Sequence, residues 1–374
     1  MQTSLLKRIP WDRVNWTTSL FLAVVNILSV VAVPLYVWHF GLDWFQVGLF
    51  LFFYIATGLS ITLGYHRLFS HLSFKAKLPV KLGTLVFGAC AFENSALDWC
   101  SDHRKHHKFV DHEDDPYDIS KGFFWAHIGW LFVKLTPETM NNVNDLKRDP
   151  LVMWQHRWCI PMAFIVGFGV PTLLGYLWNG WAGALGAFLI AGVFRVFLVQ
   201  HCTFFINSLC HTVGKQPYST SHTARDSAVM ALFTFGEGYH NYHHEFQHDY
   251  RNGVKPTNFD PTKWTIWTLS KLGLVSDLRR VPDEKILLAE MHEARRRAEQ
   301  KLKEPQVLVS VFGQQAQQTL AQLSERLAAN YAALEKAMAE QAEVSRKAID
   351  NWRKETREFV ALLTDLERRL PEPA

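Results

Sequence analysis

The chain has 374 residues, a length that allows one large domain or two smaller ones, and a formal net charge of +4. No basic stretch alternates with aromatic residues, which argues against a nucleic-acid partner. Its five cysteines form no CxxC pair, so we expect neither a disulfide framework nor a zinc ribbon. The 14 tryptophans and 27 phenylalanines instead suit a membrane interface.

The first two apolar runs, residues 17–38 and 44–63, are joined by the short loop 39–43. A helix needs roughly 20 apolar residues to cross the hydrocarbon core of a bilayer, so the two runs predict a transmembrane hairpin. His66 and His71 follow the second run at once, in the sequence HRLFSH. The second helix, extended past the membrane, would carry both histidines.

The segment after this hairpin contains a second histidine box, HRKHH, formed by His103, His106 and His107. Residues three and four apart on a helix share one side, so this box can direct its rings to a common point. Acidic residues that could orient metal-bound imidazoles lie near the boxes. They are Asp98, Asp102, Asp111, Glu113, Asp114, Asp115 and Glu237.

A second hairpin is predicted from the apolar runs 158–177 and 181–199, which the tight loop 178–180 separates. Asn207 and His211 follow the fourth run, at a depth similar to that of the first box. We therefore consider these two side chains the best candidates for a ninth ligand and a water-mediated ligand.

Basic residues set the predicted orientation. Neither tight loop contains Lys or Arg, whereas Arg13, Arg67 and Lys75 flank the first hairpin. Positive residues are retained on the cytoplasmic side of a membrane. We expect a multi-pass protein of the inner (cytoplasmic) membrane, with both termini and a helical cap of residues 64–157 and 200–281 on the cytoplasmic side.

The third box, His240, His243 and His244, overlaps a competing motif. His244 to His248 reads HExxH, in which two histidines bind zinc and the glutamate, here Glu245, acts as the base. A membrane zinc protease is thus an alternative, but it leaves the first two boxes without a role. A membrane metal carrier would need ligands inside the spans, and these boxes lie outside them.

The composition changes over residues 282–374, which are rich in Ala, Glu, Gln, Arg and Lys. Apolar residues then recur every three or four positions, as at Leu323, Leu327 and Leu334. This pattern predicts a C-terminal extension of long amphipathic helices, an arm or coiled coil. The arm could pack on its own domain, form an oligomer or dock a partner.

Eight histidines in three boxes are too many for one ion and suit two. The lack of thiolates argues against iron–sulfur clusters and structural zinc, and calcium and magnesium prefer oxygen ligands. Zinc, copper and iron remain open. Two ions with four or five nitrogens each and a vacant position suit di-iron chemistry with O2.

Four segments together resemble the membrane fatty acyl desaturases, in particular the stearoyl-CoA (delta-9) type, and we expect a bacterial member. They are Gly64–His71, Asp102–Phe109, Asn207–His211 and Gly236–His244. The resemblance implies an all-α, four-span fold over residues 1–281, with a di-iron site in its cytosolic cap. It implies that Asn207 holds a metal-bound water and that nine histidines bind two iron ions. These are His66, His71, His103, His106, His107, His211, His240, His243 and His244.

The implied reaction is the O2-dependent introduction of a cis double bond into a saturated long-chain acyl thioester or lipid. No haem-binding His-Pro-Gly-Gly signature occurs, so no fused haem domain is expected. We expect a separate electron donor: a ferredoxin, a rubredoxin or cytochrome b5, with its reductase. In animal relatives a basic cluster binds the CoA phosphates. Here Ser101 stands at one of those positions instead of an arginine, and Lys134 supplies one cation. Acyl carrier protein and phospholipid therefore remain alternative carriers. An alkyl hydroxylase with the same ligands is the second candidate function.

The substrate chain itself limits how a site can choose a carbon. An alkyl chain gains about 0.8 kcal/mol per buried CH2 but offers no polar handle, so the bond position must be set by distance. We expect Phe50 and Tyr54 to form the end wall of the tunnel. The resemblance places Asn94, Asp98 and Trp99 beside the chain or its head group.

Overall fold

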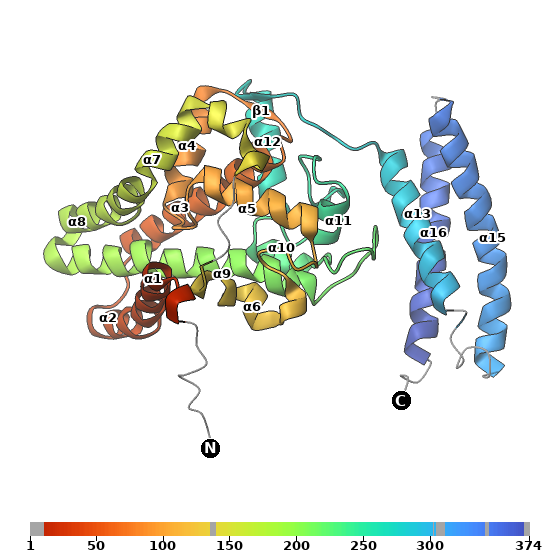
Figure 1. The fold of residues 1–374 in the computed structure, drawn as a ribbon, viewed down its shortest axis with the longest axis horizontal. Coiled ribbons are helices and arrows are strands. Elements are labelled where there is room, and N and C mark those ends of the chain that lie inside the picture. The colour runs from red at the N-terminus through yellow and green to blue at the C-terminus, as the bar shows by residue number, and fades with distance from the viewer. Residues whose placement is uncertain (1–10, 135–139, 302, 304–310, 341–343, 370–374) are drawn as a thin grey trace, which may run out of the picture. The chain divides into compact units, whose positions relative to one another are not determined.

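The structure, a computed structural model, describes residues 11–134, 140–301, 303, 311–340 and 344–369, and these are mostly helical (Figure 1). The one sheet among the described residues pairs β1 (Lys75–Ala76) antiparallel with β2 (Val275–Ser276). The chain forms two compact units. The first comprises residues up to 214 and 223–280, and the second comprises 215–222 and the residues from 281 onward.

Two long apolar helices open the first unit. They are built from α1 (Trp16–Ile27), η3 (Leu28–Ala32) and α2 (Val33–Phe40), and from α3 (Trp44–Leu59) and η4 (Ser60–Ser70). Gly41 ends the first helix with a positive φ of 75°, which a glycine adopts without strain. Asp43 begins the second through a capping box with Gln46. Both helices are long and apolar enough to cross a membrane.

The third apolar helix, Pro150–His211, is also long and apolar enough to cross a membrane, but it does not run straight. Its parts are α7 (Pro150–Phe164), η9 (Ile165–Gly169), α8 (Val170–Ala187), η10 (Phe188–Phe194), α9 (Arg195–Ser208) and η11 (Leu209–His211). Asn179 and Gly180 have non-helical backbone angles, in the predicted loop. Gly175 and Gly183 pack so closely that neither leaves room for a Cβ. The structure thus contains three candidate spans, the third folded back on itself.

Two buried polar side chains in this folded helix hold the segment that follows α4 (Leu78–Ala89). The Arg195 guanidinium is fully buried; its Nη2 donates to the Gly167 carbonyl at 2.9 Å and its Nη1 donates to the Cys90 carbonyl. The Gln200 amide donates to the Phe92 carbonyl at 3.1 Å. These bonds fix the backbone of residues 90–92 beside the site described below.

Shorter elements complete the first unit, and most of them lie in residues 64–157 and 200–281, the segments predicted to form the cap. They are η2 (Trp11–Arg13), α5 (Ala96–Phe109), η5 (Ile119–Lys121), α6 (Phe123–His127), η6 (Gly129–Phe132), η7 (Asn141–Val143), η8 (Leu146–Arg148), α10 (Ala228–Phe233), α11 (His240–Glu245) and α12 (Pro261–Lys271). Polar residues start several of them: Ser95 caps α5, Ser227 caps α10 and Asp260 caps α12.

In the described part of the C-terminal unit, α13 (Asp283–Lys301), α15 (Val311–Ala339) and α16 (Arg346–Arg369) pack together as a helical bundle. Their apolar residues form a core of their own, in which Leu287, Met291 and Leu334 are fully buried. Amphipathic helices are present where they were predicted, and they pack against one another. Residues 302, 304–310, 341–343 and 370–374 of the predicted extension lie outside the described residues.

Candidate metal centre

The first histidine pair depends on a local change in helix type. η4 is a π-helix, and the His71 amide donates to the His66 carbonyl, five residues back, at 3.0 Å. A π-turn brings residues five apart onto one side, whereas an α-helix of 3.6 residues per turn would rotate them away from each other. The two rings lie with their centroids 4.8 Å apart. The HxxxxH spacing is therefore matched by the backbone that carries it.

The other boxes lie on short α-helices. The second box occupies the last half of α5, and His103 and His106 are buried. The third box occupies α11, a helix of only six residues. His244 lies four residues after His240, and the two Nε2 atoms are 3.1 Å apart. His211 reaches the same place from η11, at the end of the third apolar helix.

The structure gathers the nine predicted histidines into two groups, in each of which the ligand atoms lie within 4.8 Å of one another. One group comprises His66, His71, His103, His107 and His243, and the other comprises His106, His211, His240 and His244. Five pairs of Nε2 atoms are only 2.8 to 3.1 Å apart. The rings thus point inward, toward one place in each group.

These separations fit transition-metal ligation. Two nitrogens about 2.1 Å from one ion, at a right angle, lie about 3.0 Å apart. The Nε2 atom of His106 is buried and has no hydrogen-bond partner among the described residues, so a metal would satisfy it. Burial, followed by the neighbouring imidazoles, lowers the pKa well below 6.5 for several of the rings, which are then the neutral bases that a metal binds. These are His71, His103, His107, His243 and His244.

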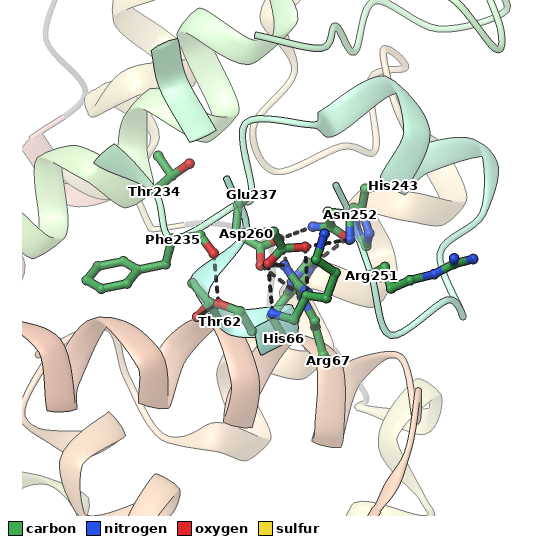
Figure 2. A network of polar contacts seen from close by, with 12 residues as sticks. Thr62, His66, Arg67, Thr234, Phe235, Glu237, His243, Arg251, Asn252 and Asp260 are labelled. Atoms are coloured by element: carbon green, nitrogen blue, oxygen red, sulfur yellow. Dashed lines mark hydrogen bonds and ion pairs between the residues drawn. The ribbon is translucent and has the colours of Figure 1, made fainter. Parts of the chain in front are cut away.

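A buried ionic network supports His66 (Figure 2). The Glu237 carboxylate lies 2.8 Å from Nδ1 of His66 and accepts from Nη2 of Arg67 at 2.8 Å. Arg67 also donates to Asp260, which accepts from the backbone N–H of Asn252 at 2.9 Å. Burial opposes ionisation, but Arg67 and His66 together lower the pKa of Glu237 below its ordinary value. A negative carboxylate therefore faces the far side of this imidazole.

Two further ligands have similar supports. Asp115 lies 2.9 Å from Nδ1 of His106. The Thr223 hydroxyl lies 2.8 Å from Nδ1 of His211 and donates to Asp111 at 2.6 Å. Three of the predicted acids thus contact one of the nine predicted ligand histidines, directly or through one hydroxyl. Of the others, Asp98 contacts Ser95 and His156, Asp102 lines the cavity, and Glu113 and Asp114 are exposed.

A cavity of about 650 Å³ opens beside the histidines, and His66, His103 and His240 form part of its wall. Most of the predicted substrate contacts line it, as does the predicted water-holding residue: Tyr54, Asn94, Asp98, Trp99, Lys134 and Asn207. Phe50 is not among the described residues of the wall; it stacks behind Tyr54 with centroids 5.7 Å apart. Glu93, Gln200 and Thr203, which were not predicted from the sequence, also line the cavity. A signal for Glu93 exists, because it is the only acidic residue in the apolar stretch 80–97.

The structure does not support the zinc-protease interpretation of HExxH. α11 ends at Glu245, so His244 and His248 do not share a helical face. His248 belongs to neither histidine group, and its Nδ1 lies 2.8 Å from the His71 carbonyl. The motif match arises because two unrelated histidines flank the end of a short helix.

Residues 42–265 match a protein family described as fatty acid desaturase. A probable acyl-CoA desaturase of Schizosaccharomyces pombe is 40% identical over 282 residues, which cover 74% of this chain and 58% of the relative. A delta(9)-fatty-acid desaturase of Caenorhabditis elegans is 35% identical over 286 residues, covering 74% and 83%. Human stearoyl-CoA desaturase 5 is 36% identical over 235 residues, covering 61% and 71%.

The match spans little more than half of each yeast relative, 58% in Schizosaccharomyces pombe and 54% in Saccharomyces cerevisiae. The compared relatives come from yeasts, a nematode and vertebrates, with one from a moth, Spodoptera littoralis. The expectation of a bacterial protein therefore finds no support.

Proposed function

The chain belongs to the fatty acid desaturase family, and from this premise we propose that it is an acyl-CoA desaturase. It would convert a saturated long-chain acyl-CoA, O2, two electrons and two protons into a cis delta-9 unsaturated acyl-CoA and two waters. One observation carries the proposal: nine inward-pointing imidazoles, in groups of five and four, at the wall of a cavity of about 650 Å³.

We assign one iron ion to each histidine group. The group of four has one histidine fewer than the other group, and Asn207, on the same cavity wall as His240, is suited to hold a water as a further ligand. Bound iron supplies the redox chemistry with O2 that no side chain provides. The chain's own residues keep the ligands neutral and oriented, and Glu237, Asp115 and Thr223 hold three of them by Nδ1.

The cavity selects an alkyl chain by shape. Burying the chain gains about 0.8 kcal/mol per CH2, and the alkyl chain itself carries no polar group that would distinguish one carbon from another. We assign Tyr54 to the closed end and Asn94, Asp98 and Lys134 to the end that receives the head group, with Trp99 between. The distance between these ends would then set which bond lies beside the histidines.

We propose that the chain crosses the membrane four times, with apolar parts of the helices 16–40 and 44–70 and of the two arms of 150–211, and that the helix ends carrying His66 and His211 extend beyond the bilayer. Trp38 and Trp181, at the turns of the two hairpins, are 85% and 81% exposed, as expected for interfacial anchors. The excess of basic residues on the other side favours a cytosolic position for both termini and the histidine groups.

Two electrons per turnover must come from outside the histidine groups. A ferredoxin, a rubredoxin or cytochrome b5, with its reductase, is a suitable donor. We keep oligomerisation or partner docking as the proposed role of the bundle of α13, α15 and α16, through its exposed polar surface, because described apolar residues of these helices form a core inside it.

Expression in a host that lacks unsaturated fatty acids, followed by mass spectrometry of its lipids, tests the activity. We expect cis-monounsaturated chains with one main double-bond position and no alcohol. His243→Ala should abolish this product, while His292→Ala, an exposed histidine outside both groups, should preserve it. An alcohol would favour the hydroxylase instead, and a single zinc ion in the purified protein would contradict the di-iron assignment.

A further inference from the structure

A carboxyl group stands in the wall of the acyl cavity where hydrocarbon is expected. Glu93 follows the backbone segment that Arg195 and Gln200 hold, so its place is fixed. The Trp99 indole donates to its Oε2 at 3.3 Å. Its other oxygen, Oε1, is buried and has no hydrogen-bond partner among the described residues. The proposed desaturation chemistry gives this group no role.

No basic side chain of the described residues balances this carboxyl. Lys134 is the one Lys or Arg of the cavity wall, and its Nζ donates to the Asp12 carbonyl at 3.2 Å. The other titratable groups facing the cavity or the carboxyl are Tyr54 from α3, Tyr65 and His66 from η4, Asp98, Asp102 and His103 from α5, Tyr117, Cys159 from α7, Cys202 from α9, Glu237 and His240.

These surroundings favour the neutral, protonated form of the Glu93 carboxyl. Burial raises the pKa of Glu93 to about 8, against smaller opposing effects of Thr203 and Trp99. An ionised carboxylate in an apolar wall needs water or a counter-ion, and an alkyl chain in the cavity supplies neither. Chain binding and ionisation of this carboxyl therefore exclude each other.

We propose that Glu93 is a specificity-determining residue, and that the cavity accepts a saturated alkyl chain only while this carboxyl carries its proton. The inference rests on the proposed function, because the alkyl chain is the substrate named there. Trp99 stacks on His103 with centroids 4.7 Å apart, so the carboxyl acts beside the part of the chain nearest the histidines.

The test is equilibrium binding of radiolabelled stearoyl-CoA to the full-length, metal-free protein in phosphatidylcholine nanodiscs, from about pH 6.5 to about pH 9.5. We expect the affinity to fall about tenfold per pH unit above a midpoint near the pKa of Glu93. Glu93→Gln keeps an acceptor for Trp99 and cannot ionise, so its affinity should not change with pH. In the iron-loaded enzyme, KM should rise with pH while kcat stays constant. The midpoint of this rise should lie at a lower pH than in the metal-free protein, because bound cations favour the ionised carboxylate.

The thiol Cys202 is the matched control, because thiols ordinarily titrate in the same range. Cys202→Ser should keep the pH dependence of the unmodified chain, whatever its affinity. An infrared band of a protonated carboxyl that titrates in the unmodified protein and is missing in Glu93→Gln gives a second readout, independent of substrate.

Two results would overturn this inference and leave the proposed function standing. They are an equal pH dependence of binding in the unmodified protein and Glu93→Gln, and a titrating infrared band that persists in Glu93→Gln. A profile that becomes flat in Cys202→Ser would assign the effect to the thiol and also overturn it. No binding and no turnover of stearoyl-CoA by either protein at any pH would instead contradict the proposed function.

Discussion

Three of the proposed ligand imidazoles have their second nitrogen held by a side chain, in one case from a segment distant in sequence and in two from nearby positions. Glu237 holds His66 from 171 positions away in the numbering, whereas Asp115 holds His106 from the loop after the same helix. Such contacts fix the tautomer and the orientation of a metal-bound imidazole. The ligand geometry therefore depends on carboxylates that are not ligands themselves.

Replacing Glu237 by Gln removes the negative charge beside His66 and keeps the volume of the side chain. We expect an about 10- to 100-fold loss of iron affinity, the usual effect of losing such a partner. Iron titration of the purified protein measures it, and the exposed Glu113→Gln serves as the control. Unchanged iron affinity in Glu237→Gln would show that this contact only supports the fold.

Tyr54 lines the cavity, and Phe50 lies behind it. Tyr54→Ala should lengthen the cavity and shift the preference toward acyl chains a few carbons longer, because each added CH2 then gains about 0.8 kcal/mol. Phe50→Ala should have the smaller effect. Competition between acyl-CoAs of different length, read by mass spectrometry, gives the answer; an unchanged product profile in Tyr54→Ala would place the end wall elsewhere.

At the scale of elements, the first histidine box is positioned by close packing of η4 on α4. Gly64 leaves no space for a Cβ against Thr84, and Gly88 leaves none against the ring of Tyr65. Tyr65 is fully buried and accepts a hydrogen bond from Gln155 at 2.6 Å. Two glycines on facing helices thus let the backbone that carries His66 approach its neighbour.

Two alanine substitutions in α4 separate packing from helix propensity. Gly88→Ala should lower the stability by about 1–3 kcal/mol, because the ring of Tyr65 cannot move without losing its buried partner. Gly83→Ala meets no atom within 4 Å and should be neutral or stabilising by up to about 1 kcal/mol. Thermal unfolding in detergent compares them, and equal effects would mean that the helix contact is loose.

For the whole molecule, the cap holds buried neutral imidazoles, and this couples folding to pH. The pKa of His71, His103, His107, His243 and His244 lies well below 6.5 in the folded protein. Below about pH 6.5 the unfolded chain binds protons that the folded chain does not, so stability falls as the pH falls. Each histidine contributes up to about 1.4 kcal/mol per pH unit in that window.

We therefore expect the unfolding temperature of the metal-free protein to drop between about pH 7.5 and about pH 5.5, and bound iron to oppose the drop. His243→Ala, with one titrating ring fewer, should show a shallower dependence. A flat profile in the unmodified protein would mean that the rings are protonated in the folded state.

Much of the molecule follows from local patterns. Apolar runs of about 20 residues require helices in a bilayer, and the histidine spacings require residues on one side of a helix, so both were predictable without coordinates. The helices of 282–374 were predictable from their period, but their folding back into a bundle was not, because a stripe of apolar residues does not say what covers it. Tyr54 lines the cavity whereas Phe50 packs behind it, and this difference was not predictable either, because two residues one turn apart in a helix can face different surroundings.

The residue types narrowed the chemistry, since imidazoles without thiolates leave zinc, copper and iron as candidate metals, and the resemblance to the desaturases favours iron. Which five rings and which four form each group depends on contacts between segments up to 177 positions apart, such as His66 with His243. The sequence marks Glu93 as a single acid in an apolar stretch, but its burial in the cavity wall does not follow from that local pattern, for the same physical reason. Burial and distance are properties of packed neighbours, and neighbours in space are set by the folded chain and not by the order of its residues.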